Sequence, residues 1–292
     1  MVVHHRCVLA VLLSLTASVA WGLADFCGGL FSRRWPAMSV LLIVEAGGLI
    51  AAGTIVLAAR DPFPDLEHTL YAVLAGLAGV SALALFYTAL SIGTMSIVAP
   101  LSATGATVPV VVGVAGGDRL TALIVVGLVL AMAGVMLAGR EAEADGAASA
   151  ADRAHTRRVI LLSLGAALGF GTFFVFYDTA ADASLGWAIL LSRVPAIPVV
   201  ALIVWRRGLP VPRGTDLLRL IGVAQLDCVA TSLYAVAITR GALSVVAVVG
   251  SLYPVATVVL ARVVLRERLR RVQAAGVVIA LLGVALISLG SA

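Results

Sequence analysis

Long apolar runs separated by short polar segments follow one another along the whole chain. Windows of about 19 residues pick out ten runs that are long enough to cross a bilayer as helices. A longer polar segment at 140–158, REAEADGAASAADRAHTRR, has nothing to bury and is typical of a linker. The pattern predicts an all-α polytopic membrane protein with ten transmembrane helices, five on each side of the linker. The predicted spans are 7–31, 37–59, 69–89, 96–116, 120–138, 159–177, 185–205, 217–238, 242–265 and 272–289.

The first run could instead be a cleaved signal peptide, because small residues precede a candidate cleavage site after Ala20. Its apolar character continues to Phe31, however, which makes the run long enough to span the membrane. We therefore expect this run to be the first transmembrane helix.

The two halves of the chain resemble each other. A shift of 149 positions lays DRL at 118–120 on ERL at 267–269, and Trp21-Gly22 on Phe170-Gly171. Each match alone is weak, but the matches keep their order along the chain. We expect two copies of one five-span unit, at 1–139 and 159–292. Because each copy has an odd number of spans, the second must enter the membrane from the opposite side, which gives an inverted repeat.

Composition agrees with a membrane protein. Of all residues, 62% are hydrophobic and 12% are charged, and the mean hydropathy is +1.12, whereas soluble domains carry about 25% charged residues. The net charge of +5 comes from arginines that lie mostly between the spans, which suits loops beside lipid head groups and not a nucleic-acid surface. Cys7, Cys27 and Cys228 have no metal-ligand spacing, so we expect no disulfide, metal or cofactor.

Three stretches resemble the EamA-type transporters of the drug/metabolite transporter superfamily. They are AWGLADF at 20–26, the stretch from 86 to 120 that ends in GDRL, and the stretch from 233 to 287 that contains Pro254 and RERL. In the first copy the turn acid is Asp118, where the family has glutamate. The resemblance implies a ten-helix basket whose central cavity is lined mainly by spans 1, 3, 4, 6, 8 and 9. It also implies alternating access for amino acids, metabolites or drugs, often exported.

Four charged residues lie well inside predicted spans, where each costs about 2.5–3.5 kcal/mol on insertion scales. The first is Asp25, one helical turn after Trp21 and beside Gly22 and Gly29. Small residues indicate close helix contact, so the acid faces protein or water and not lipid. We expect Asp25, with Trp21, to bind a proton or the substrate. The alternative is a carboxyl that is hydrogen-bonded to a neighbouring helix.

Glu45 and Arg193 occupy equivalent places in spans 2 and 7, because a shift of 148 carries one onto the other. Opposite charges near the pseudo-two-fold axis of an inverted repeat can meet and offset each other's burial cost. The sequence predicts an ion pair or gate here, and the alternative is two separately solvated charges.

Asp227 shares a helical face with Tyr234 in span 8 and could bind substrate or simply bond another helix. In span 6, Phe174 takes the place that Asp25 has in span 1, and Tyr177 lies on the same face. With Tyr87, these rings would suit an amphipathic or cationic solute, although packing between helices explains them equally well.

Prolines mark expected breaks in the helices. Pro100 and Pro109 fall in span 4, Pro195 and Pro198 fall in span 7, and Pro254 falls in span 9. Each removes a backbone donor, which membrane proteins tolerate where the opening is buried or lines a cavity.

These features favour a secondary transporter that moves a small organic solute by rocking of the two copies against each other. We expect coupling to protons through an acid such as Asp25, and a homodimer is compatible with the sequence. A lipid flippase, or a membrane protein or enzyme that transports nothing, is the alternative. Against an enzyme, the four histidines lie outside the spans, and neither HExxH, Gly-x-Ser-x-Gly nor a Walker element occurs.

The sequence gives conflicting indications of how the protein is oriented in the membrane. Loops on the side of the termini carry four arginines and the other loops carry thirteen. The positive-inside rule would place both termini outside the cytoplasm, whereas the family topology places both inside. We favour the family topology, in the plasma membrane of a bacterium. The four arginines on the side of the termini are Arg6, Arg60, Arg119 and Arg240.

Overall fold

The computed structural model is all-α, as predicted. It describes residues 2–115, 121–139, 150–238, 240, 249–250, 252–269 and 271–290. Within these residues, six helices are long and apolar enough to cross a membrane, and three shorter apolar helices accompany them. Asp118, the first part of the predicted ninth span and most of the predicted linker lie outside the described residues.

The helices of the first half match its five predicted spans, with the fourth span divided. They are α1 (Val2–Ser32), α2 (Ala37–Ala59), α3 (Leu66–Ile92), α4 (Met95–Ala103), the 3₁₀ helix η1 (Thr104–Ala106), α5 (Thr107–Ala115) and α6 (Ala122–Gly139). The second half follows the same order, with its seventh span divided. Its described helices are α8 (Ala150–Ala181), α9 (Leu185–Arg193), α10 (Ala196–Arg206), α11 (Thr215–Ile238), α13 (Tyr253–Val264) and α14 (Arg271–Gly290).

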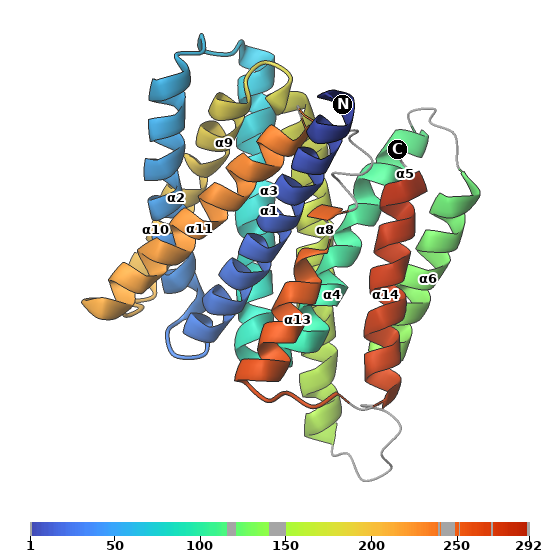
Figure 1. Cartoon of the computed structure of the whole chain (residues 1–292). Helices are drawn as coiled ribbons and strands as arrows, with labels where there is room; N and C mark the ends of the chain where they lie inside the picture. Colours follow the sequence, from blue (N-terminus) through green and yellow to red (C-terminus); the bar gives the residue numbers. More distant parts are fainter. Residues whose placement is uncertain are drawn as a thin grey trace.

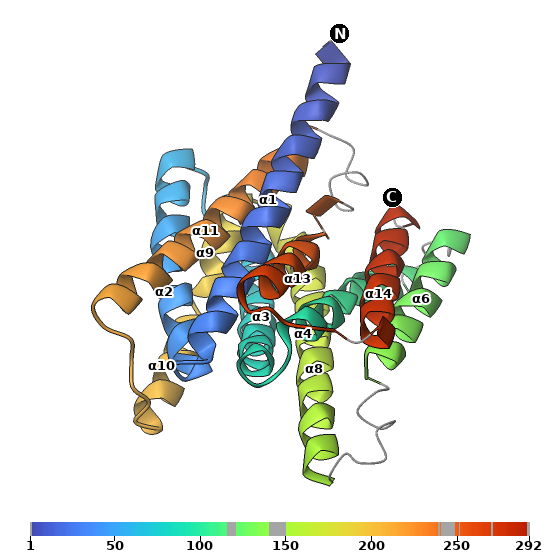
Figure 2. The same ribbon diagram turned by 60° about the horizontal axis from the view of Figure 1, so that its bottom comes forward.

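The two halves interlock. The first helix of each half packs against the third helix of the other: α1 packs on α11, and its counterpart α8 packs on α3. The fifth helices, α6 and α14, pack side by side at one edge of the bundle (Figures 1 and 2). Each contact between halves is therefore matched by a second contact with the roles of the halves exchanged, as a pseudo-two-fold axis requires.

Counterpart helices run in opposite directions. The side chain of Arg33, just after α1, donates to backbone oxygens of Leu90 and Gly93 at the end of α3. His155, near the start of α8, contacts the carbonyl oxygen of Ile92 at 3.1 Å. The end of α1 thus lies beside the start of α8, which gives the two halves inverted directions. The start of α1 and the end of α14 both lie at the other end of the bundle (Figure 1).

Breaks in the helices occur near the prolines that the sequence singled out. Pro100 lies inside α4, which ends three residues later at η1, and Pro109 lies in the first turn of α5. Pro254 is in the first turn of α13, where its missing N–H costs nothing. The seventh span breaks at Val194 and Pro195, between α9 and α10.

The predicted linker is shorter in the structure than in the sequence analysis. Residues 150–158 form the first turns of α8, and residues 151–158 are exposed apart from Thr156. Alanine and arginine are strong helix formers, so these turns need no apolar face to continue the helix out of the span. Hydropathy alone could not detect this extension.

Two equivalent glycines allow the first helix of each half to approach a broken span closely. A Cβ on Gly22 would collide with the carbonyl oxygen of Tyr253 and with Ala256, at the start of α13. A Cβ on Gly171 would collide with the carbonyl oxygen of Gly105 in η1 and with Val108 in α5. The match between the two Trp/Phe-Gly pairs therefore reflects a packing requirement that both halves share.

Candidate functional site

The charged residues of the spans meet where the seventh span breaks. Arg193 is the last residue of α9, and its guanidinium lies 3.4 Å from a carboxylate oxygen of Glu45 in α2. Its other terminal nitrogen donates to Asp227 in α11, at 2.7 Å. The side chains of Arg193 and Glu45 are 13% and 6% exposed. One guanidinium thus joins acids from both halves of the chain, in a region where removing a single partner would leave a buried charge unpaired.

Two consecutive glycines in α2 make room for this arrangement. A Cβ on Gly48 would overlap the guanidinium of Arg193, and a Cβ on Gly47 would lie 2.7 Å from that of Ala224 in α11. The two glycine carbonyls also accept hydrogen bonds from α11, one from the Gln225 amide and one from the Cys228 thiol. The close approach of α2 and α11 therefore holds Glu45 and Asp227 near the same arginine.

Asp25 is the fourth charged member of the cluster, and Arg193 does not reach it. Among the described residues its carboxyl has no hydrogen bond and no ion pair, and it lies close enough to Asp227 for the two negative charges to repel each other. Tyr87 and Tyr253 lie within electrostatic range of the same carboxyl. The four charged side chains come from α1, α2, α9 and α11, and we call them the charge cluster.

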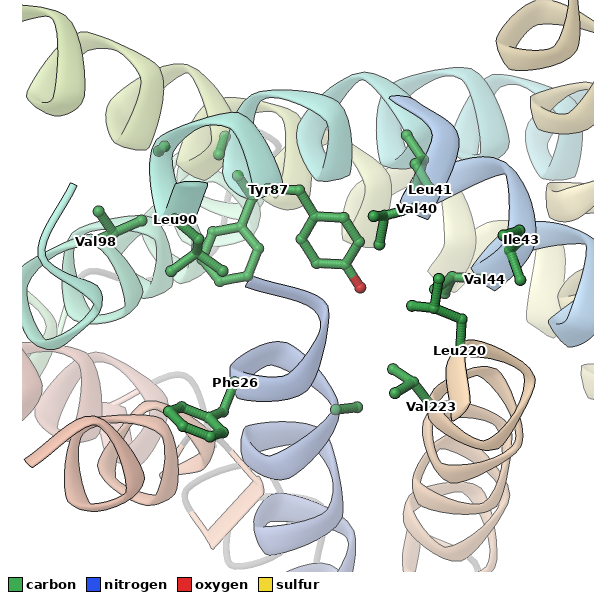
Figure 3. Close-up of a cluster of buried hydrophobic side chains, with 14 of the residues drawn as sticks. Phe26, Val40, Leu41, Ile43, Val44, Tyr87, Leu90, Val98, Leu220 and Val223 are labelled. Atoms are coloured by element: carbon green, nitrogen blue, oxygen red, sulfur yellow. The ribbon is translucent and has the colours of Figure 1, made fainter. Parts of the chain in front are cut away.

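Aromatic rings lie on both sides of Asp25 along α1. One turn before it, the Trp21 ring lies 5.2 Å from that of Tyr234 in α11. One turn after it, the ring of Tyr87 from α3 fills the space beside Gly28, where a Cβ would come within 2.6 Å of the ring. Figure 3 shows the Tyr87 hydroxyl directed into the gap between α1 and α2. The acid is thus placed between two aromatic groups.

Of the two aromatic residues predicted in span 6, Tyr177 lies within electrostatic range of Arg193. Its ring stacks on that of Phe173 with centroids 5.0 Å apart, and its buried hydroxyl has no hydrogen-bond partner among the described residues. Phe174 is 50% exposed, and its only ring neighbour among the described residues is Phe173. Phe173, one residue from the predicted position, is the ring that packs against α3, at Gly79. The structure therefore does not join Phe174 to the charge cluster.

A second network joins the helix ends on the side rich in arginine. Glu267, in the loop between α13 and α14, accepts from the backbone N–H groups of Met95 and Ser96 and from the Ser96 hydroxyl, at 2.9–3.1 Å. Arg33 donates to the same carboxylate at 3.1 Å and to carbonyls at the end of α3. A carboxylate at the first turn of α4 also complements the helix dipole. We call these residues the end network.

Comparison with known proteins gives two findings. The EamA-like transporter family matches the chain twice, over residues 8–140 and 157–289. The chain belongs to the EamA-like transporter family. A crystal structure described only as that of a protein, one of 15 matching chains, shares the fold with a TM-score of 0.65. Its sequence identity is 16%, over 97% of this chain and 98% of that chain. A search of curated proteins gave no match.

Family membership establishes the general class of protein. This EamA-like protein is a multi-pass integral membrane protein, and its family consists of transporters, which normally are not enzymes. A transporter of this family implies a small-molecule substrate. The two family matches, one in each half, agree with the repeated halves that the sequence predicted.

Sequence reasoning missed several residues of this EamA-like protein. Gly47 and Gly48 carried a signal, because adjacent small residues indicate close helix contact. Tyr253 carried none, since its proximity to Asp25 depends on how α13 packs on α1. In the sequence, Arg33 is one of many loop arginines and Glu267 is part of the RERL motif, so neither residue indicates contact with the other.

Proposed function

We propose that this protein is a secondary transporter that moves a small organic solute by alternating access and that the charge cluster forms its solute and coupling site. The observation that carries the proposal is the meeting of four charged side chains from both halves of a family member inside its spans. Such side chains are costly in a membrane, and in transporters they mark substrate and proton pathways. Export, and a bacterial plasma membrane, belong to the same proposal.

Alternating access in this protein requires motion between helix pairs and not between whole copies. The first copy contributes α1 to the α1–α11 pair and α3 to the α3–α8 pair, and the second copy contributes the other helix of each pair. Rigid rocking of one copy would therefore break the packing within both pairs. We therefore propose that the α1–α11 pair moves against the α3–α8 pair. The end network would then hold one end closed, because Arg33 ties the end of α1 to the end of α3.

Proton coupling would depend on Asp25, the member of the cluster that has no positive partner among the described residues. The groups on neighbouring helices that lie within electrostatic range of it are Asp227, Tyr87 and Tyr253. An acid that repels a second acid can exchange a bound proton for another cation, and this exchange would couple the proton gradient to solute movement.

Asp25→Asn is expected to leave the fold intact and to make solute movement insensitive to an imposed proton gradient. The test is a panel of amines, amino acids, organic acids and neutral metabolites, measured with purified protein in liposomes with and without the gradient. Asp182→Asn, at an exposed position after α8, is the matched control and should behave as the wild type. An unchanged response to the gradient in Asp25→Asn would reduce Asp25 to a structural residue.

The panel also separates the alternative functions. If folded protein moves no solute but moves labelled lipid between leaflets, it is a flippase. If it moves neither, the transporter proposal is wrong and the protein has a role in the membrane other than transport. A homodimer would be detected in the same preparations by the mass of the protein in nanodiscs.

A further inference from the structure

The charge cluster has fewer positive than negative groups. The cluster holds three carboxyl groups, on Asp25, Glu45 and Asp227, and its one positive group among the described residues is the guanidinium of Arg193, which contacts only Glu45 and Asp227. With all of them ionised, the cluster would carry a formal charge of −2. Uncompensated charge inside a membrane protein is costly, so the cluster calls for a further positive group.

Arg193 cannot supply the missing charge to Asp25. Both of its terminal nitrogens already contact acids, at 3.4 Å from Glu45 and 2.7 Å from Asp227. Because these two acids already balance the charge of the guanidinium, a substrate carboxylate would enter a site with an excess of negative charge. The arrangement therefore disfavours anions and favours a cation beside Asp25.

Tyr87 provides an independent indication of a ligand. It is 3% exposed, and no hydrogen bond joins its hydroxyl to another residue that the structure describes, although the oxygen is not one of the fully buried atoms without a partner. The hydroxyl points into the gap beside α1 (Figure 3) and lies within electrostatic range of all four members of the cluster. An ammonium group beside Asp25 would donate to this hydroxyl oxygen.

The rings along α1 favour an organic cation over an inorganic one. Trp21, Asp25 and Gly28 lie at positions i, i+4 and i+7, so they share one face of the helix. Trp21 pairs with Tyr234 at one end of this face, and the Tyr87 ring covers Gly28 at the other. Aromatic faces attract ammonium groups, and they also bury the apolar part of such a molecule. Within the described residues, no three His, Cys, Asp or Glu side chains are grouped to hold a metal ion.

We propose that Asp25, Asp227 and the hydroxyl of Tyr87 bind the ammonium group of an organic monoamine, and that Trp21 and Tyr234 contact its apolar part. Glu45 and Arg193 are positioning residues, since their ion pair holds Asp227 in place. This assignment rests on the proposed transport function and specifies its substrate class. Amino acids and organic anions are excluded as preferred substrates, because their carboxylate would face Asp25 or Asp227.

The test is equilibrium binding to the full-length protein in nanodiscs, measured by calorimetry. Butylamine, phenethylamine and tryptamine are each compared with an alcohol and a carboxylate of the same carbon skeleton. At least one amine should bind about tenfold or more tightly than its alcohol, as expected for one charge-assisted hydrogen bond. Asp25→Asn should weaken the binding of that amine by about tenfold or more. Asp25→Glu should retain part of the wild-type affinity, and Asp182→Asn should leave the affinity unchanged.

If Asp25→Asn does not fold, Tyr87→Phe provides the second variant. This substitution removes only the hydroxyl. It should weaken the binding of the amine by about fivefold and leave the binding of the alcohol unchanged. Equal binding of amines and alcohols, or no effect of either variant, would overturn the assignment. If no amine binds but liposomes move a neutral or anionic solute, the substrate class is wrong and transport stands. If no solute of any class moves, the proposed function itself fails.

Discussion

Replacing Arg193 with glutamine is expected to abolish solute transport and to destabilise the protein by about 3–5 kcal/mol. The substitution leaves Glu45, which is 6% exposed, without the only positive partner that it has among the described residues, and it removes the 2.7 Å contact to Asp227. It also leaves unfilled the space beside Gly48 that the guanidinium occupies. The measurements are solute movement in liposomes and the midpoint of thermal unfolding in detergent.

Two controls separate charge balance from general damage. The double variant Glu45→Gln/Arg193→Gln removes one charge of each sign, so it should be more stable than Arg193→Gln alone. Arg219→Gln removes the arginine of an exposed pair with Asp216, 3.7 Å apart, and should change stability by less than about 1 kcal/mol. A double variant no more stable than the single variant would mean that Glu45 and Arg193 are not energetically coupled.

Gly171→Ala is expected to destabilise the protein by about 1–3 kcal/mol, although alanine ordinarily favours a helix. The added Cβ would collide with the carbonyl oxygen of Gly105 and with Val108, so α8 and the broken fourth span must separate. Because Gly22 makes the equivalent contact with α13, Gly22→Ala should have a similar effect. The thermal midpoint and the fraction of protein that remains monodisperse in detergent measure the change.

Gly222→Ala in α11 is the matched control, because nothing lies within 4 Å of the position that its Cβ would take. It should leave the thermal midpoint unchanged or raise it slightly. If Gly171→Ala is as stable as Gly222→Ala, the close approach of α8 to η1 is not required for the fold.

The fold and one contact of the charge cluster could be predicted from the sequence. Ten apolar runs indicated the spans, and the prolines indicated where two of them break. The shift of 148 that relates Glu45 to Arg193 singled out two residues that lie 3.4 Å apart in the structure. This inference was available because an inverted repeat brings equivalent positions near its axis together, whatever the details of side-chain packing.

The remaining contacts depend on tertiary packing that a single sequence does not encode locally. Asp227 could have pointed to several neighbours, and only the close approach of α11 to α2 at Gly47 directs it to Arg193. Phe174 shared a helical face with Tyr177, yet Phe173 is the residue that contacts α3 at Gly79, whereas Phe174 is 50% exposed. Loop charges such as Arg33 and Glu267 are far apart in sequence, so their contact could be recognised only in the folded protein.

The central claim is that the α1–α11 pair moves against the α3–α8 pair to open one end as the other closes. It is tested most directly by electron–electron distance measurements between spin labels in nanodiscs, in a background without Cys7, Cys27 and Cys228. One label pair, at Arg34 and Arg157, reports on the end that holds the end network, and the other, at Arg240 and Asp182, reports on the opposite end. Glu267→Gln, which weakens the end network, should lengthen the first distance and shorten the second. Distances that stay fixed at both ends, in protein that still transports, would contradict the account.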